Sequence, residues 1–164
     1  MFLRKRNKKP YMFPKKRKRK SFTVGATILA LACILLYCMY GEMRISYQWL
    51  PKQAKDFLES NFPKDRCLCA ERKHDDALIE YEVQLVGGTK LEFTSSGEWK
   101  KIDCGYSFVP SGIVPQAISS DVKSRCPNGH ICKIERAHGG YKVKAGSGPE
   151  LIYAADGTFI RTDT

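Results

Sequence analysis

The feature that most constrains the fold is an internal duplication, because residues 50–103 and 114–163 follow one pattern twice. Each copy opens with an apolar residue and a proline, and a second proline follows twelve positions later. The matched segments are Glu71-Arg72 with Glu135-Arg136 at an offset of 64, and Tyr81-Glu82-Val83 with Tyr141-Lys142-Val143 at an offset of 60. A unit of roughly 50–60 residues is too long for a solenoid repeat and is typical of two small half-domains that share a core.

Each copy predicts one helix followed by strands. In the first copy, apolar residues recur at helical spacing between Pro51 and Pro63, and residues 78–85 then alternate between apolar and polar side chains, as in a strand with one buried face. In the second copy Asp121 stands where the first has Phe57, which predicts a less tightly held helix. The predicted class is therefore α+β, with two tandem repeats of one helix packed on a four-stranded antiparallel sheet. The predicted boundaries are 48–103 for the first unit, 104–113 for the linker and 114–164 for the second unit.

The positive charge is concentrated at the N-terminus. Residues 1–20 hold eleven Lys and Arg and no acid, whereas the remaining 17 basic residues face all 17 acidic ones. The rest of the chain thus carries no net basic field to hold phosphates, and we predict that it does not bind nucleic acid.

An uncharged run of twenty residues, 21–40, follows the basic block. As a helix it would be about 30 Å long, one hydrocarbon thickness, and the basic flank predicts that residues 1–20 are cytoplasmic. The sequence thus predicts a single transmembrane signal anchor in contact with membrane lipids, with the C-terminal domain outside the cytoplasm. The alternative is a cleaved signal peptide and a secreted protein, since Ala30-Leu31-Ala32 matches the small-x-small pattern. Residues 15–20 also resemble a nuclear-localisation or RNA-binding tract, but the adjoining apolar run favours an anchor flank.

The cysteines outside the apolar run number five, so they cannot all pair. Cys67 and Cys69 are two apart on a predicted strand, which places them on one face and too far apart to bridge. Cys126 and Cys132 flank a Pro-Asn-Gly turn, and we predict a disulfide between them. The alternative is a zinc site built from Cys126, His130, Cys132 and His138, but a cysteine spacing of six is wider than the two to four of a zinc knuckle. We predict no metal and no other cofactor.

Many positions of the chain resemble one family. The segments that carry the resemblance are Leu50-Pro51 through Phe62-Pro63, Tyr81-Glu82-Val83, Gly88 through Phe93, Gly97 through Lys100, Ile102-Asp103-Cys104, Val109-Pro110 and Ile113-Val114-Pro115. Together they resemble the bacterial PepSY-like, β-lactamase-inhibitor-like proteins over about residues 48–163. The resemblance implies tandem helix-plus-four-strand units and secretion to the bacterial envelope. The predicted anchor would then lie in a bacterial inner membrane, with the C-terminal domain periplasmic or extracellular. It implies no established reaction and carries over no inhibitory residues.

The sequence offers no catalytic constellation. A hydrolase needs a base with a nucleophile and an orienting group beside it, and the three histidines are His74, His130 and His138. His74 and His138 occupy matching positions between the first and second strands of each copy, so a shared turn explains them. We therefore predict that the protein is not an enzyme.

The predicted solvent face of the sheet is the candidate site. It carries Glu80, Glu82, Gln84 and Glu92 in the first copy and Lys142 and Lys144 in the second. This difference in sign predicts a docking surface for a protein of the bacterial envelope. The predicted function is a protein-binding or inhibitor-like module without catalytic activity. The alternatives are an accessory factor in the folding or maturation of a secreted enzyme, and a small metal-binding envelope sensor.

Overall fold

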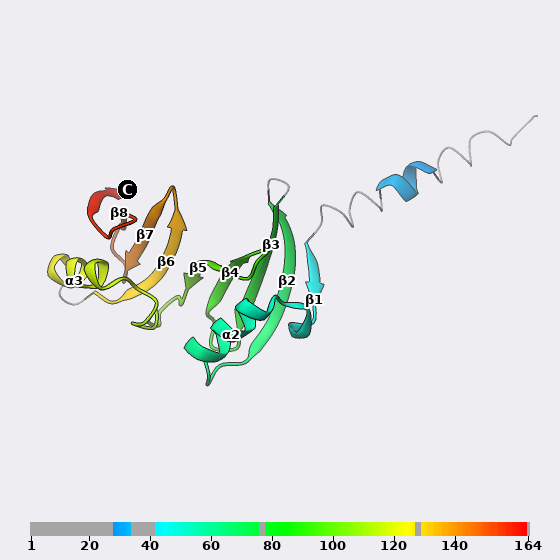
Figure 1. Cartoon of the computed structure of the whole chain (residues 1–164), viewed down its shortest axis with the longest axis horizontal. Coiled ribbons are helices and arrows are strands. Elements are labelled where there is room, and N and C mark those ends of the chain that lie inside the picture. Colours follow the sequence, from blue (N-terminus) through cyan, green and yellow to red (C-terminus); the bar gives the residue numbers. More distant parts are fainter. Residues whose placement is uncertain (1–27, 34–41, 76–77, 127–128, 164) are drawn as a thin grey trace, which may run out of the picture. The chain divides into compact units, whose positions relative to one another are not determined.

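The computed structural model describes residues 28–33, 42–75, 78–126 and 129–163 (Figure 1). The chain divides into two compact units, Met1–Tyr37 and Cys38–Thr164. The helices and strands of the second unit are β1 (Met43–Ile45), η1 (Tyr47–Trp49), α2 (Lys52–Asn61), β2 (Cys67–Asp75), β3 (Leu78–Leu85), β4 (Lys90–Thr94), β5 (Trp99–Asp103), α3 (Gln116–Arg125), β6 (Ile131–Ala137), β7 (Gly140–Ala145), β8 (Glu150–Ala154) and β9 (Phe159–Asp163).

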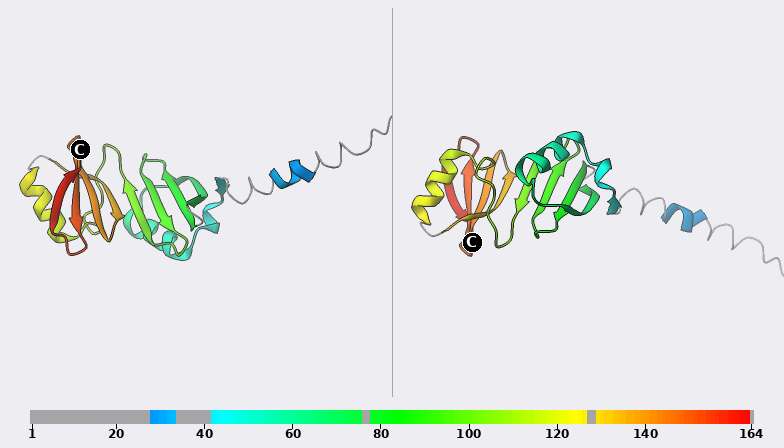
Figure 2. Two further views of the ribbon diagram at one scale, coloured as in Figure 1. Left: turned by 90° about the horizontal axis from the view of Figure 1, so that it is seen from above. Right: turned by 90° about the horizontal axis from the view of Figure 1, so that it is seen from below.

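The nine strands of the described residues form one antiparallel sheet, in the order in which they occur along the chain. The ribbons in Figure 2 follow this order from β2 in green to β9 in red. β5 pairs directly with β6, with Ile102 opposite Ile134. The predicted arrangement, an α+β fold of two helix-on-four-strand repeats, is therefore wrong. Its separate sheets do not exist, because the last strand before α3 and the first strand after it share a ladder, and β1 adds a strand that the sequence did not predict.

The predicted transmembrane helix is also not among the elements that the structure describes. Among the residues that the structure describes, no helix is long and apolar enough to cross a membrane. Of the predicted span, only residues 28–33 are described, as a short helix, and the rest of the span lies outside the described residues, as does the basic segment 1–20.

Both helices pack on the same face of the sheet. Ile102 and Ile134 are fully buried opposite each other, and cross-strand partners point to the same side. Ala54 and Leu58 of α2 join the same core cluster as Ile118 and Val122 of α3. We call the opposite side of the sheet, which neither α2 nor α3 covers, the open face.

The turns between the last two strands of each half lie against the helices. Gly97 and Gly157 have positive φ angles of 91° and 86°, a conformation that favours glycine. A Cβ at Gly97 would lie 2.8 Å from the backbone nitrogen of Ala54, and one at Gly157 would lie 2.8 Å from Cβ of Ala117. Each helix therefore rests directly on a turn that requires glycine.

The last strand of each half, β5 and β9, carries a β-bulge at positions that lie 60 residues apart. Glu92 pairs with Lys101 and Phe93 with Trp99, so Lys100 is the extra residue, as the phase of the alternation around Trp99 predicts. The same shift occurs between β8 and β9, where Ile160 is the extra residue. The two edges of the sheet are thus a three-residue strand and a bulged strand, both of which discourage edge-to-edge aggregation.

Asp121 of α3 has a hydrogen-bond partner, whereas its counterpart in the first half, Phe57, makes an aromatic contact. Phe57 packs on Phe93 with ring centroids 5.9 Å apart, whereas at the equivalent place the hydroxyl of Tyr153 donates to Oδ2 of Asp121 at 2.9 Å. Arg125 donates to the same oxygen at 2.6 Å and stacks over Phe159 at 3.6 Å. The bond from Arg125 and that from Tyr153 lower the pKa of Asp121, while burial and the neighbouring carboxylate raise the pKa of Tyr153. An aromatic cluster in one half is thus replaced by a hydrogen-bonded one in the other.

Candidate protein-binding face

The open face carries one row of side chains that crosses all nine strands. Successive cross-strand partners are Arg44, Glu71, Glu82, Glu92, Lys101, Glu135, Lys142, Ile152 and Arg161. We call this set the central row. Three of the predicted site residues, Glu82, Glu92 and Lys142, belong to it.

A second row of side chains, next to the central row on the open face, holds two more of the predicted residues, Gln84 and Lys144. Its members, from β2 to β9, are Cys69, Gln84, Lys90, Asp103, Lys133, Lys144, Glu150 and Asp163. Glu80 lies on the other side of the central row, between Lys73 and Thr94. The structure therefore places all six predicted residues on one face.

Each predicted carboxylate has a lysine within ion-pair distance. Glu80 lies 2.7 Å from Nζ of Lys100, Glu82 lies 2.6 Å from Nζ of Lys73, and Glu92 lies 2.8 Å from Nζ of Lys101. Three carboxylates on adjacent strands, Glu71, Glu82 and Glu92, would repel one another, so these lysines also relieve a cross-strand conflict.

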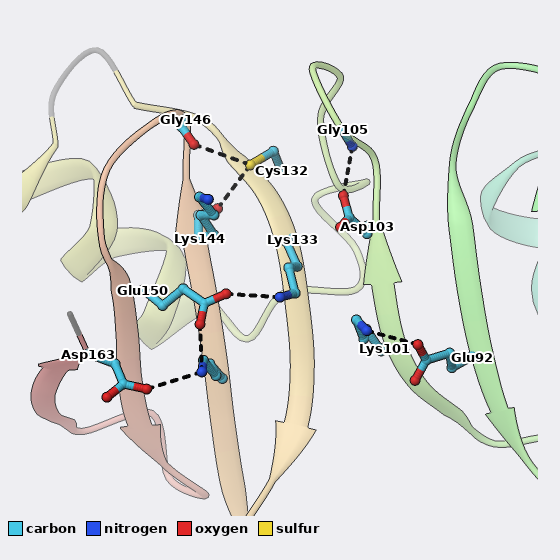
Figure 3. Close-up of polar contacts among 11 residues, drawn as sticks. Glu92, Lys101, Asp103, Gly105, Cys132, Lys133, Lys144, Gly146, Glu150 and Asp163 are labelled. Carbon is cyan, nitrogen blue, oxygen red and sulfur yellow. Dashed lines mark hydrogen bonds and ion pairs between the residues drawn. The ribbon is translucent and has the colours of Figure 1, made fainter.

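The basic half of the face is paired in the same way. Lys142 contacts Glu150 at 2.6 Å and Asp163 at 3.1 Å, and Lys133 contacts Glu150 at 2.9 Å. Figure 3 shows Glu150 in contact with Lys133, and Asp163 on the strand at the edge of the sheet. The bonds from Lys142 and Lys133 lower the pKa of Glu150 to about 2. The bond with Glu82 is likewise the main cause of the raised pKa of Lys73.

The partner residues Lys73, Lys100, Lys101, Glu150 and Asp163 were missed by the sequence analysis. They are ordinary charged positions, and their roles depend on strand register and on the bulge at Lys100. The alternation of charges along each strand was the only available signal. The open face is consequently a lattice of half-buried ion pairs rather than two separate patches of opposite sign.

The cysteines lie on different sides of the sheet. Cys126 packs against the core cluster, whereas Sγ of Cys132 lies 3.5 Å from the carbonyl oxygen of Lys144 on the open face (Figure 3). Both thiols are free in the structure, and the disulfide between them stays a prediction. A bulge between Cys67 and Cys69 changes their register, so Cys67 packs on the core side while Cys69 contacts Gln84.

The histidines do not share one environment. His74 lies within β2 opposite Ile79, His138 lies in the turn before β7 with a φ of 51°, and the ring of His130 packs on Phe108 at 4.3 Å. In the part of the chain that the structure describes, no group of three or more His, Cys, Asp or Glu side chains is placed to hold a metal ion.

The fold and the face define a small sheet protein with helices on one side and a charged open face on the other. The family described as "Putative beta-lactamase-inhibitor-like, PepSY-like" matches the chain over residues 39–85 and again over 79–161. The chain belongs to this family, as its sequence pattern suggested.

Solved structures support the same assignment. A "putative periplasmic protein" of the DUF2874 family from Bacteroides vulgatus is 32% identical with a TM-score of 0.71, covering 76% of this chain and 98% of that chain. A "putative calcium-regulated periplasmic protein" from Bacteroides thetaiotaomicron is 30% identical with a TM-score of 0.71, covering 75% and 97%. A further periplasmic protein of unknown function from Bacteroides vulgatus is 31% identical with a TM-score of 0.73, covering 76% and 100%. No curated protein matches the chain.

Proposed function

We propose that this protein is a periplasmic or secreted, inhibitor-like binding module that docks another protein of the bacterial envelope through its open face and catalyses no reaction. The observation that carries the proposal is the central row, which crosses the whole sheet on the side that neither helix covers. Membership of a family described as inhibitor-like supports a protein partner.

The chemistry of the open face suits recognition by charge. The carboxylates of Glu80, Glu82 and Glu92 are 17–28% exposed, so a partner that covers them removes little further water. Ion pairs that are already formed within the face hold these side chains in place and lower the entropic cost of binding. Complementary charges on a partner would then determine specificity and the rate of encounter.

The location follows from the relatives, since the three similar structures are of periplasmic proteins. A reporter enzyme that is active only outside the cytoplasm, fused after Thr164, should therefore be active in bacterial cells. Activity of a reporter that works only in the cytoplasm would contradict this location.

The binding proposal is tested with a charge exchange that preserves the internal ion pair. In the variant Glu80→Lys/Lys100→Glu the two charges swap places, so the pair remains and the melting temperature should change little, while the pattern presented to a partner is inverted. We expect the affinity for a partner captured from envelope extracts with the full-length chain to fall by about 1–3 kcal/mol. A captured enzyme precursor would identify the partner as a maturing enzyme.

The matched control is the same exchange away from the open face. Lys52 and Asp56 form an exposed pair on α2 with a distance of 2.6 Å, and Lys52→Asp/Asp56→Lys should leave binding unchanged. If the partner binds the Glu80/Lys100 exchange variant as tightly as the parent, in low salt as in high, the open face does not carry the interaction.

A further inference from the structure

The open face is not the same in its two halves. In the first half a cross-strand row reads Lys73, Glu80 and Thr94, with the bulged Lys100 beside it. The equivalent row in the second half reads Ala137, Gly140 and Ala154, with the bulged Ile160 beside it. In the central row, Glu92 likewise has Ile152 as its counterpart. Ion pairs in one half thus correspond to apolar side chains in the other.

These apolar positions line a cavity of about 340 Å³ that opens on the open face between β6 and β9. Ala137, Gly140 and Ala154 contribute to its lining, as do Ile152 and Ile160, and the side chain of Ile160 is 57% exposed. A Cβ at Gly140 would collide with the carbonyl of Tyr153, so the close approach of β7 and β8 at this point admits only glycine.

One side of the cavity carries a hydrogen-bond donor with spare capacity. The side chain of Arg161 is 63% exposed, and among the described residues its one ion-pair partner is Asp163 at 3.1 Å. A guanidinium has five N–H donors, so most of those of Arg161 remain available to a ligand. Lys142 is occupied by Glu150 and Asp163.

The carboxylates around the cavity do not oppose an anion at Arg161. Asp163 is already bonded to both Lys142 and Arg161. Glu135 also lines the cavity, but it lies opposite Lys101 and Lys142 in the central row, three strands away from Arg161, with about 14 Å between the two backbones at the usual strand spacing.

We propose that this cavity is the anchor point of the open face and binds an apolar side chain of the partner protein that has a carboxylate next to it, with the carboxylate on Arg161. The inference deepens the proposed function and rests on it. Its chemistry is that of a small pocket with apolar walls, where Arg161 has donors to spare while Lys142, which also lines the pocket, is held by Glu150 and Asp163.

The test uses a small probe and needs no knowledge of the partner. N-acetyl-L-phenylalanine, which joins an apolar ring to a carboxylate, is titrated into the full-length ¹⁵N-labelled chain. We expect saturable amide shifts confined to residues around Ala137, Gly140, Ala154 and Arg161. The amide derivative of the probe, which lacks the charge, should bind about 5- to 10-fold more weakly, and Arg161→Gln should weaken the acid by the same factor.

Reciprocal substitutions supply the controls. Ile152→Glu gives the second half the residue that the first half has at this position, and it should abolish the shifts. Glu92→Ile makes the opposite exchange in the first half and should leave the titration unchanged. Absence of saturable shifts, or shifts that Ile152→Glu and Arg161→Gln leave intact, would overturn the inference. If the partner still binds under those conditions, the proposed function stands without this anchor.

Discussion

Replacing Tyr153 with phenylalanine removes one hydroxyl from the centre of the second half. The side chain is 1% exposed, and its hydroxyl donates to Asp121 at 2.9 Å, so the substitution deletes a buried hydrogen bond to a charged group, worth about 1.5–3 kcal/mol. Asp121 keeps its bond to Arg125, and its side chain is 28% exposed, so water replaces part of the loss. We therefore expect a destabilisation near the lower limit, about 1.5–2 kcal/mol, or a fall of about 5 °C in melting temperature.

Urea denaturation of the full-length chain measures this loss, and two further variants test its cause. Phe93→Tyr at the equivalent place brings a hydroxyl beside Phe57, and burying it without an acceptor should cost about 1–3 kcal/mol. Asp121→Phe alone removes the acceptor, whereas Asp121→Phe/Tyr153→Phe restores the all-apolar cluster of the first half. The double variant should therefore be more stable than Asp121→Phe. A change of less than 0.5 kcal/mol in Tyr153→Phe, or simple additivity in the double variant, would refute the hydrogen-bond account.

Three further outcomes are expected. The pKa of Glu150 is lowered from 4.5 to about 2, so its ion pairs stabilise the fold fully above about pH 4.5, and this contribution is lost as the pH falls towards 2. Acid unfolding of Glu150→Gln should therefore depend less on pH in that range. Gly157→Ala forces a Cβ onto Ala117 at a φ of 86° and should cost about 1–3 kcal/mol by chemical denaturation, whereas Gly112→Ala, where a Cβ meets nothing within 4 Å, should cost less than 0.5 kcal/mol. Mass mapping of non-reduced peptides tests the predicted bridge between Cys126 and Cys132. Because the structure places the two side chains on different sides of the sheet, we expect both as free thiols, and a bridged peptide pair would confirm the disulfide predicted from the sequence.

The local elements were predictable from the sequence, and their assembly was not. Pro51 and Pro63 bounded α2, the alternation in residues 78–85 marked β3, and the lost phase at Trp99 revealed the bulge at Lys100. The pairing of β5 with β6 left no such signal, because alternation shows which side chains are buried and not which strand lies alongside. An edge strand and a central strand with one covered face have the same pattern.

For the candidate site, too, the local pattern was predictable from the sequence and the contacts between strands were not. Period-two alternation was enough to place Glu80, Glu82 and Lys142 away from the core. Their ion-pair partners required the register between strands, which a bulge shifts by one residue. The opposite sides of Cys67 and Cys69 have the same cause, since the extra residue between them reverses the expected orientation.

The order of the nine strands also has a consequence for how the chain reaches its structure. Every strand pairs with the next one in sequence, so most contacts are local and the relative contact order is low for a β-sheet protein. The longest connection between the described strands, residues 104–130, separates β5 from β6, whose shared ladder has only three registered pairs. Hairpins on either side can therefore form early, and we expect the closure of this longest connection to be the step that joins them. Either half of the sheet can therefore begin to fold first, and we expect the β5–β6 junction to close after the hairpins that flank it.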